Sequence, residues 1–478
     1  MLWLCISLPQ LPLEALHPEE SEQAVVVTTC EGSTRWILCS NAAAEQANLQ
    51  APMNYTVALA IHPELVMLNR KPAAEQAALE RLAAWAYQFS STVILSEIQE
   101  ELRLARTSCL WLEMGASLNL FGGLPKFIEQ VEAGLKQLDY TYLLGIGPTL
   151  EGSALLARAG IRVAIATPHA LFMRIRNLPI GKLTLPPQMT EQLHTVGVRT
   201  LGMLLELPRA SIAKRFGPDT SNFLNRLMGE SPDPRHIFRL PEKYAAHFEF
   251  DFEVRSTEGL LFPLRRMLNE FAGYLRARDT GVQRFFIAFG HRSAPATKTS
   301  IGSAASDRNA ERFFALVREC LQNLELPEAT ISLTVSASEF AAPTALQIDL
   351  LNRSQDEAEN LVHTIDRISA RLGQENVHGV RLAADHRPEL SWAASSLDEA
   401  SANLHFPDRP LWLLPQPKAL QLAAIPRITS GPERIEAGWW DDGDVQRDYY
   451  IVRVANGQDL WVFRDLRSSE WYLHGFWS

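Results

Sequence analysis

The chain has 478 residues, of which 46% are hydrophobic and 21% are charged, so the sequence predicts a globular protein of about three to five domains rather than a disordered chain. Its formal net charge of −10 excludes a chain that is basic throughout. The five cysteines include no pair at metal-finger or redox spacing, which argues against a disulfide framework and leads us to expect a cytoplasmic protein.

The first sixteen residues are apolar, and Pro9 and Pro12 interrupt them. They lack the basic leader and the small-residue cleavage site of a signal peptide, so residues 2–8 (LWLCISL) are predicted to form a buried strand. No run of about 18 or more apolar residues occurs, and we therefore expect neither a membrane-spanning helix nor a membrane partner.

Helix-like and strand-like stretches alternate through the first 180 residues. Residues 72–89 carry the apolar stripe of an amphipathic helix. We then expect a strand over 109–121, a helix over 125–138, a strand over 141–147, a helix over 153–160 and a strand over 161–166. This order predicts an α/β domain whose sheet is covered by helices.

The rest of the chain divides into three regions that differ in predicted secondary structure. Short helices fill the stretch from Pro179 to 240. A compact α+β domain is predicted next, with strands over 247–254, 284–290 and 330–337 and helices over 260–278 and 308–324. Beyond it we expect a helix over 354–372, a Pro-rich link over 407–426 and an aromatic-rich β region over 430–478.

Three stretches resemble the Y-family translesion DNA polymerases in their order and spacing. Residues 36–70 (WILCSNAAAEQANLQ and onward) resemble the fingers pattern, 143–160 (LLGIGPTLEGSALLARAG) the palm, and 178–208 (LPIGKLTLPPQMTEQLHTVGVRTLGMLLELP) the thumb. The resemblance covers residues 1–351 and implies a multidomain α/β and α+β right-hand architecture of palm, fingers, helical thumb and little finger.

The chain is most similar to the ImuB subgroup of that family. The opening LWLCISLPQLPLEAL, the stretch LWLEMGASLNLFGG and a C-terminal stretch over 431–477 carry this likeness, and ordinary Y-family polymerases lack the last of these. The implied domains are a palm over 1–13 and 85–177, fingers over 14–84, a helix-hairpin-helix thumb over 178–240, a little finger over 241–340, a clamp-binding tail over 341–353 and a C-terminal partner-binding region over 354–478.

The resemblance implies that the catalytic carboxylates are missing. Nucleotide addition requires two Mg²⁺ ions, which prefer carboxylate ligands. The first palm position falls on Cys5 or Ser7, depending on the alignment, and the Asp-Glu pair falls on Ser108 and Cys109. Thiols and hydroxyls cannot replace three carboxylates on Mg²⁺, so we expect no metal and no cofactor.

The residues that the resemblance assigns to the nucleotide pocket have also lost the groups that binding requires. Counted from Asn41, the Tyr and Arg that hold the triphosphate in the family fall on Ala42 and Glu45, and Glu45 would repel a phosphate. We interpret Glu97, Glu100 and Glu101 as a solvated face rather than a replacement metal site. Glu113 is interpreted as structural, because one acid cannot hold two metal ions.

Residues 172–320 hold 22 Lys/Arg against 15 Asp/Glu, and the remainder holds 23 against 40. In the thumb, Leu185-Pro186-Pro187 replaces one phosphate-binding hairpin, and Gly197 with Arg199 remains in the other. We expect weak, salt-sensitive and sequence-independent DNA binding through these residues and through little-finger arginines, unless nearby carboxylates pair with them: Arg265, Arg266, Arg276, Arg278, Arg284 and Arg292.

A short motif after the little finger, Gln347-Ile348-Asp349-Leu350-Leu351, resembles the peptide that binds the bacterial sliding clamp, and we expect Gln347, Asp349, Leu350 and Leu351 to bind it. The aromatic residues over 439–477 form either a small β core or anchors for a partner. By resemblance, the C-terminal partners are a RecA-like accessory protein and an error-prone replicative-type DNA polymerase subunit.

Together these features predict a non-catalytic adaptor in mutagenic DNA repair, which binds the clamp and delivers an error-prone polymerase to damaged DNA. The alternative is an active translesion DNA polymerase with an atypical metal site, which would require Mg²⁺.

Overall fold

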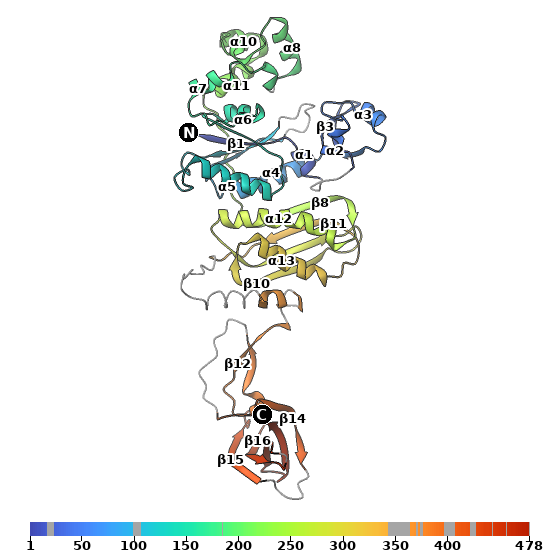
Figure 1. Cartoon of the computed structure of the whole chain (residues 1–478), viewed down its shortest axis with the longest axis vertical. Coiled ribbons are helices and arrows are strands. Elements are labelled where there is room, and N and C mark those ends of the chain that lie inside the picture. Colours follow the sequence, from blue (N-terminus) through green and yellow to red (C-terminus); the bar gives the residue numbers. More distant parts are fainter. Residues whose placement is uncertain are drawn as a thin grey trace. The chain divides into compact units, whose positions relative to one another are not determined.

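The computed structural model describes residues 1–16, 23–98, 107–183, 185–342, 364–369, 371–372, 376–395, 407–420, 427–441, 443–455 and 457–477. The chain divides into two compact units, Met1–Arg371 and Leu372–Ser478 (Figure 1). In the part of the chain that is described, no helix is both long and apolar enough to cross a lipid bilayer.

The first sheet of unit 1 joins strands that are far apart in the sequence. β1 (Trp3–Leu8) lies between β6 (Ser108–Glu113) and β7 (Leu143–Gly147), and β5 (Val93–Leu95) forms the edge beside β6. β1 is antiparallel to both neighbours, and all of its residues are buried. The expected first strand is therefore confirmed.

Helices cover both faces of this sheet. α4 (Pro72–Ala86) and α5 (Leu124–Gln137) pack on one face, where Leu4, Ile6 and Leu8 meet Leu79, Leu82, Phe127 and Val131. α6 (Leu150–Arg158) covers the other face, where Cys5, Cys109 and Trp111 meet Leu150, Ala154 and Ala157. Successive strand residues point to opposite faces, so odd-numbered and even-numbered residues of β1 enter different cores.

A smaller sheet follows α1 (Leu11–Glu14). It has the order β3-β2-β4, formed by β2 (Val25–Glu31), β3 (Thr34–Ser40) and β4 (Val66–Asn69). β2 is antiparallel to β3 and parallel to β4. α2 (Ala42–Gln46) and α3 (Tyr55–Ile61) contribute Ala44 and Ala58 to the core of this sheet.

The helical stretch expected from Pro179 to 240 instead runs from Pro168 to Met228, and no helix forms over 229–240. It contains α7 (Pro168–Ile175), the 3₁₀ turn η1 (Ile180–Lys182), α8 (Pro187–Thr195), α9 (Leu201–Leu205), α10 (Arg209–Phe216) and α11 (Pro218–Met228). Gly197 and Gly217, with φ of +85° and +90°, stand at two of the tight connections. Glycine adopts this left-handed backbone without the steric cost that other residues carry.

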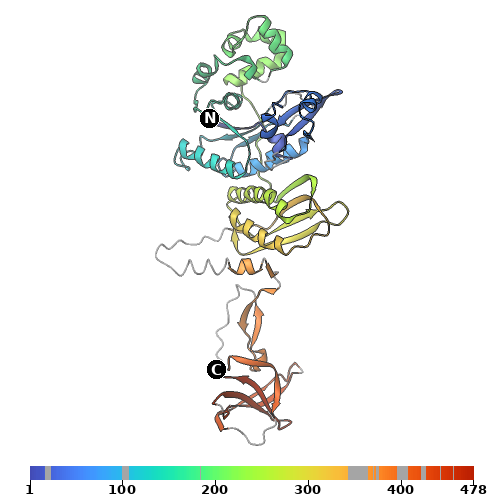
Figure 2. The ribbon, with the colours of Figure 1, turned by 45° about the vertical axis from the view of Figure 1, so that its right-hand side comes forward.

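The last part of unit 1 is an α+β domain. β8 (Tyr244–Val254), α12 (Thr257–Ala277), β9 (Val282–Gly290), β10 (Thr297–Asp307), α13 (Ala310–Gln322) and β11 (Thr330–Ala337) follow one another in the chain. The sheet order is β10-β9-β11-β8, and Figure 2 shows α12 and α13 on one of its faces. Phe271, Phe285 and Phe313 lie in the core between helices and sheet.

Two glycines allow close packing of α12 and α5 on α4. A Cβ at Gly273 would lie 2.4 Å from Cδ1 of Trp85, and a Cβ at Gly134 would lie 2.5 Å from Cζ2 of the same ring. Because both positions lack a side chain, the buried indole of Trp85 fills the space between three helices. This contact connects the first sheet with the α+β domain.

Unit 2 contains two antiparallel sheets. β12 (Gly379–Leu382) pairs with β13 (Trp392–Ser395), and the 3₁₀ turn η3 (Pro388–Leu390) lies between them. A five-stranded sheet has the order β14-β18-β17-β16-β15, from β14 (Trp412–Leu420), β15 (Arg427–Ala437), β16 (Val445–Arg453), β17 (Asp459–Asp465) and β18 (Trp471–Phe476). Tyr449, Trp461 and Phe463 form its aromatic core. The predicted fold class, mixed α/β and α+β with an aromatic-rich C-terminal β region, is confirmed.

Several predicted elements were wrong. The strand expected over 109–121 ends at Glu113, and turns follow it. No strand forms over 161–166, where the Ile165 amide donates a single hydrogen bond to the Ile146 carbonyl at 3.1 Å. β10 was not expected at all.

The Pro-rich link expected over 407–426 contains β14, which lies at the edge of its sheet and so tolerates Pro415 and Pro417. Of the helix expected over 354–372, only 364–369 and 371–372 belong to the described residues, and they are helical.

Candidate functional site

The strand register brings together the four positions predicted to correspond to the catalytic carboxylates. Ser7 lies opposite Cys109, Leu8 opposite Ser108 and Cys5 opposite Trp111 in the β1–β6 pair. Because side chains alternate between faces, Cys5, Ser7 and Cys109 share the face covered by α6, and Ser108 points to the other. The first catalytic position therefore lies on the face covered by α6, whether the alignment assigns it to Cys5 or to Ser7.

The shared face is closed to solvent. Cys5 and Ser7 have 0% exposed area and Cys109 has 2%. The Cys109 thiol donates to the Thr107 carbonyl at 3.2 Å. Burial, followed by the neighbouring Cys109 thiol, raises the pKa of Cys5 well above its ordinary value. A protonated thiol and a hydroxyl in this position are poor ligands for a hard cation such as Mg²⁺.

The acids near this face have other roles. One carboxylate oxygen of Glu113 accepts the amides of Leu2 at 3.3 Å and Gly115 at 3.1 Å, and the other accepts the Ala116 amide at 3.4 Å. The carboxylate thus holds the turn that ends β6, which agrees with the structural interpretation of this residue. Glu97 is exposed, whereas Glu100 and Glu101 lie outside the described residues. In the described ranges, no three His, Cys, Asp or Glu side chains gather in a group that could hold a metal ion.

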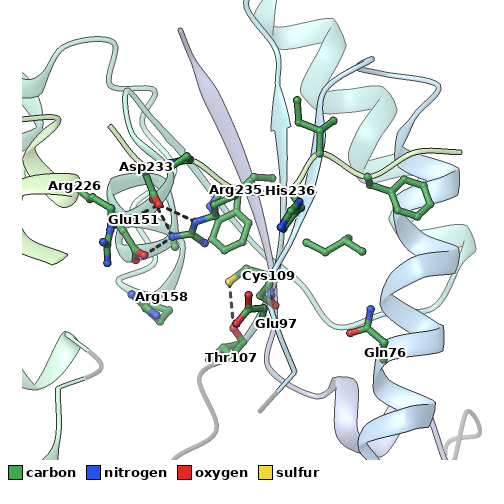
Figure 3. Close-up of a pocket in the computed structure, with 17 residues that line it drawn as sticks. Gln76, Glu97, Thr107, Cys109, Glu151, Arg158, Arg226, Asp233, Arg235 and His236 are labelled. Atoms are coloured by element: carbon green, nitrogen blue, oxygen red, sulfur yellow. Dashed lines mark hydrogen bonds and ion pairs between the residues drawn. The ribbon is translucent and has the colours of Figure 1, made fainter. Parts of the chain in front are cut away.

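A cavity of about 610 Å³ opens beside the Cys109 side of the sheet (Figure 3). α6 contributes Glu151 and Arg158, α11 contributes Arg226, and the segment 233–238 that follows the helical region forms one wall. Three arginines and three acids, Glu97, Glu151 and Asp233, line it. The lining is therefore charged but balanced, unlike a pocket that collects the negative charge of a triphosphate.

Arg235 occupies the centre of this site. Its Nη2 donates to Glu151 Oε1 at 2.5 Å and to Asp233 Oδ2 at 2.9 Å, and its guanidinium carbon lies 4.7 Å from the centre of the Trp111 ring (Figure 3). Trp111 in turn donates its indole N–H to the Leu150 carbonyl at 2.9 Å. A cation over an aromatic face, paired with two carboxylates, fixes this segment on the sheet.

The backbone of the same segment extends the edge of the sheet. The Phe238 amide donates to the Val93 carbonyl at 2.8 Å, and Ile237 forms an antiparallel bridge with Ile94. Arg235 and Glu151 are 84 residues apart, so no local pattern could have predicted their pairing. The only signal in the sequence was a charged pair, Asp233 and Arg235, on either side of Pro234.

In the small sheet, Asn41 caps α2. Its side-chain oxygen accepts the Ala44 amide at 2.9 Å and the Val25 amide at 3.0 Å, which positions the helix against β2. Ala42 and Glu45 are both exposed on one face of this helix, three residues apart. The helix thus presents a methyl group and a negative charge at the positions predicted to correspond to the triphosphate clamp.

In the helical region, Gly197 and Arg199 lie between α8 and α9, and both are exposed. The left-handed φ of +85° at Gly197 and the Thr200 side chain, which accepts the Met203 amide at 3.4 Å, shape this hairpin. Pro186 and Pro187 stand at the start of α8, where proline is tolerated and an amide donor is lost. The Gly197 and Val198 amides of this hairpin donate to the His194 and Leu193 carbonyls at 3.0 and 2.9 Å, so they hold the turn rather than offering free donors.

The arginines of α12 do not form one exposed row, because this helix is packed between its own sheet and α4. Arg266 is only 8% exposed. Its guanidinium lies 3.6 Å from the centre of the Tyr140 ring, and its Nη1 donates to the Glu14 carbonyl at 3.1 Å. A side chain held in this way is not available to a phosphate. The expectation that Arg266 binds DNA therefore does not fit its position.

Arg265, Arg276 and Arg278 are more accessible, yet each has a partner. Arg265 donates to Glu311 at 3.2 Å, Arg276 to the Gln88 side chain at 3.0 Å and Arg278 to the Pro241 carbonyl at 2.9 Å. Arg292 lies 3.4 Å from Glu253. The pairing with nearby acceptors, which the sequence left open, is thus found at these positions.

The face of the β10-β9-β11-β8 sheet opposite α12 carries a different set of side chains. Arg284 and Phe286 are exposed there, and the strand register puts Ser300 and Ser336 beside Phe286 and puts Lys298 and Thr334 beside Ala288. Glu249 of β8 lies beside Ser332 on the same face, so the face carries one exposed carboxylate together with the two cations Arg284 and Lys298. This face was not expected from the sequence, because β10 was not predicted.

The clamp motif, Gln347, Asp349, Leu350 and Leu351, lies outside the described residues.

Comparison with solved structures shows likeness to polymerases over about 70% of the chain. DinB from Sulfolobus solfataricus aligns with 72% of this chain and 100% of its own length, at 13% identity and a TM-score of 0.40. The insertion ternary complex of Dbh DNA polymerase aligns with 70% of this chain and 98% of its own, at 12% identity and a TM-score of 0.41. No family model matches the chain.

Comparison with curated proteins gives a likeness in sequence that extends through both units. "Protein ImuB" of two strains of Caulobacter vibrioides, NA1000 / CB15N and ATCC 19089 / CIP 103742 / CB 15, is 28% identical over 453 residues, which span 87% of this chain and 97% of the relative. The chain is therefore similar in sequence to Protein ImuB over most of its length.

Proposed function

We propose that this chain is a non-catalytic, polymerase-like adaptor in DNA-damage-induced mutagenesis and translesion synthesis in the cytoplasm. It binds the sliding clamp through its tail and recruits an error-prone replicative-type DNA polymerase subunit and a RecA-like accessory protein through its C-terminal region. The domain boundaries inferred from the sequence belong to this proposal, including the palm, fingers, thumb and little finger of residues 1–340.

The observation that carries the proposal is the chemistry of the face shared by β1 and β6. Thiol and hydroxyl side chains, Cys5, Ser7 and Cys109, are buried there beneath α6, where a polymerase needs carboxylates for two Mg²⁺ ions. Arg235 and its two carboxylate partners line the adjacent cavity. Ala42 and Glu45 support the same conclusion, because neither can bind a triphosphate.

Primer extension tests the absence of activity. The purified full-length chain is incubated with a primer-template, the four nucleotides and either Mg²⁺ or Mn²⁺, beside an active Y-family polymerase as the positive control. We expect no extension above the enzyme-free background with either metal. Template-dependent incorporation by the wild-type chain, lost again in Glu151→Gln or Glu97→Gln, would instead support an active translesion polymerase with an atypical metal site.

The clamp contact is assigned to Gln347, Asp349, Leu350 and Leu351, on the spacing of a Gln and two large apolar residues in the sequence. The double variant Gln347→Ala with Leu350→Ala should lose binding to immobilised clamp. Asn352→Ala, in the same segment but outside the motif, is the matched control and should bind as wild type. Equal binding of the double variant would remove the clamp from the proposal.

DNA binding is proposed to be weak and independent of sequence. Gly197 and Arg199 of the hairpin, with Arg284 and Lys298 on the open sheet face, support it by their exposure. Arg265, Arg276 and Arg278 contribute less, because each is partnered within the protein. Fluorescence anisotropy with a labelled primer-template should show an affinity that falls about tenfold or more between 50 and 200 mM salt. An affinity that does not change with salt would contradict phosphate binding.

A further inference from the structure

The C-terminal aromatic residues fall into two groups in unit 2. Tyr449, Trp461 and Phe463 are buried in the five-stranded sheet. Trp439 and Trp440, in the connection between β15 and β16, have 78% and 59% of their area exposed. Their ring centres are 5.4 Å apart at an interplanar angle of 84°, so the two indoles meet edge to face and expose a joint apolar surface.

A buried guanidinium holds this connection in place. Arg387, whose side chain is 4% exposed, stands just before η3. It donates to both carboxylate oxygens of Asp441, at 2.9 and 2.5 Å, and to the Gly443 carbonyl at 3.2 Å. Asp385 accepts from the other side of the same guanidinium at 2.7 Å. Bidentate pairing of this kind fixes orientation as well as distance.

The two glycines of the connection are required by this arrangement. A Cβ at Gly438, which has φ of +86°, would lie 2.3 Å from the Gly443 carbonyl oxygen. A Cβ at Gly443 would lie 2.5 Å from Nη1 of Arg387. The backbone therefore closes tightly around Arg387, whose guanidinium carbon is 5.7 Å from the Trp440 ring. The tryptophans are held outward on a prearranged loop.

Prearranged, exposed tryptophans have the properties of a binding anchor. Tryptophan is among the residue types that carry most of the energy of protein interfaces, and a fixed loop loses little conformational entropy when it binds. The charge of the unit indicates the kind of partner, because residues 372–478 contain 15 Asp/Glu and 10 Lys/Arg. A net negative charge favours a partner with a basic contact surface.

We propose that Trp439 and Trp440 are the anchors through which unit 2 binds a partner protein with a basic contact surface and apolar sockets for two indoles. The inference rests on the proposed adaptor function and names the residues of its C-terminal region that carry the contact. The core aromatics Tyr449, Trp461 and Phe463 take no part in the contact and serve the fold.

The test uses the full-length chain and the two purified proteins of the proposed function, the RecA-like accessory protein and the polymerase subunit, in a direct binding assay. Trp439→Ala with Trp440→Ala should weaken binding to one of them by roughly 30-fold or more. Trp412→Ala is the matched control, since Trp412 is 72% exposed on β14 of the same unit, and it should bind within about threefold of wild type. All variants should keep the wild-type melting temperature, because the altered side chains are exposed.

A second pair of variants separates the effect of the Arg387–Asp441 pairing on the loop from the effect of negative charge alone. Asp441→Asn and Asp444→Asn each remove one negative charge from the connection, but only Asp441 pairs with Arg387, and Asp444 pairs with Arg467. Asp441→Asn should weaken binding several-fold more than Asp444→Asn. Binding by the wild-type chain should also weaken between 50 and 300 mM salt, as expected for a basic partner.

The outcomes distinguish this inference from the function on which it rests. If the wild-type chain binds neither protein, the proposed adaptor function is wrong, and this inference with it. If wild type binds and the Trp439/Trp440 double variant binds equally well, the anchors are wrong and the adaptor function stands. If Trp412→Ala loses as much as the double variant, or if salt has no effect, the assignment to this loop or to a basic partner is overturned.

Discussion

Arg81 of α4 donates from Nε to Oε2 of Glu270 in α12 at 2.7 Å, in a pair whose side chains are 13% and 1% exposed. The Tyr140 hydroxyl donates to the other carboxylate oxygen at 3.2 Å. Arg266 lies 3.8 Å from the same carboxylate and stacks on the Tyr140 ring. One buried carboxylate thus joins the first sheet and its helices to the α+β domain.

Arg81→Met should leave Glu270 buried without its main partner. Removal of one member of a buried ion pair commonly costs about 3–5 kcal/mol, so we expect the free energy of unfolding of unit 1 to fall by that amount. Urea denaturation followed by tryptophan fluorescence measures it. Arg162→Met is the control, because Arg162 is 71% exposed and 3.4 Å from Glu132, and it should change the free energy by less than about 1 kcal/mol. Equal losses in both variants would contradict the buried role of the Arg81–Glu270 pair.

Gly273→Ala should destabilise the contact of α12 with α4. The added methyl group would lie 2.4 Å from Cδ1 of the buried Trp85 ring, and relief of that overlap requires a shift of the helix or of the indole. Overpacking of this kind costs about 1–3 kcal/mol. Gly181→Ala, at a position with no atom within 4 Å of the added Cβ, should stay within about 0.5 kcal/mol of wild type. Thermal unfolding of both variants provides the comparison. If Gly273→Ala keeps the wild-type melting temperature, the Trp85 ring can move aside at little cost in free energy.

His474 should make the stability of unit 2 depend on pH. Burial lowers its pKa from 6.5 to about 4, although Glu389 Oε2 at 3.8 Å opposes the shift. Between these values the unfolded chain binds the proton and the folded one does not, so stability is fully present above about pH 6.5 and is lost as pH falls towards 4. The Nδ1 atom also meets the Tyr449 hydroxyl at 2.8 Å.

The measurement is the melting temperature of the full-length chain at pH 7 and pH 5, followed by near-ultraviolet circular dichroism of the aromatic stack. His474→Phe keeps a ring against Trp461 and cannot titrate, so its melting temperature should fall less between the two pH values than that of wild type. An equal fall in both proteins would assign the pH dependence to other groups.

The cysteines should differ widely in their reaction with a thiol reagent. Cys30 is exposed, whereas Cys5, Cys39 and Cys109 are buried. Burial, followed by the Glu75 carboxylate, raises the pKa of Cys39 to about 12, and the thiolate is the reactive form. At pH 8 we expect Cys30 to react first, and the three buried thiols at least about 100-fold more slowly, since local opening that costs about 3 kcal/mol gives that factor.

Labelling with Ellman's reagent, with Cys30→Ser as the control that removes the fast phase, measures these rates. The result also bears on the face beneath α6. If Cys109 reacted as fast as Cys30 in the native protein, the face beneath α6 would be open to solvent and would not bury its thiols in place of a metal site.

Local sequence patterns predicted the helices and strands whose buried residues recur at a regular spacing. The apolar run of β1, the stripe of α4 and the alternation of β11 (Thr330–Ala337) all formed, because a strand or helix that buries one face needs apolar residues at a fixed period. The pattern failed where a strand depends on its neighbours. β10 contains mostly Ser, Thr, Gly and Ala and forms by pairing with β9, and β14 tolerates two prolines only because it lies at an edge.

The sequence by itself determined which chemical groups this protein has: thiols and hydroxyls at 5, 7, 108 and 109, a methyl group and a carboxylate at 42 and 45, and an aromatic-rich C-terminal region. Residue type and spacing are sufficient for that inference.

Only the tertiary structure decided which of these groups meet. It paired Ser7 with Cys109, placed Arg235 on Trp111 and Glu151, and buried Arg266 beside Tyr140. It also separated Trp439 and Trp440 on the surface from Trp461 in the core. The physical reason is that contacts between residues many positions apart depend on how whole elements pack, and local periodicity carries information about which face of an element is buried but none about what will cover it.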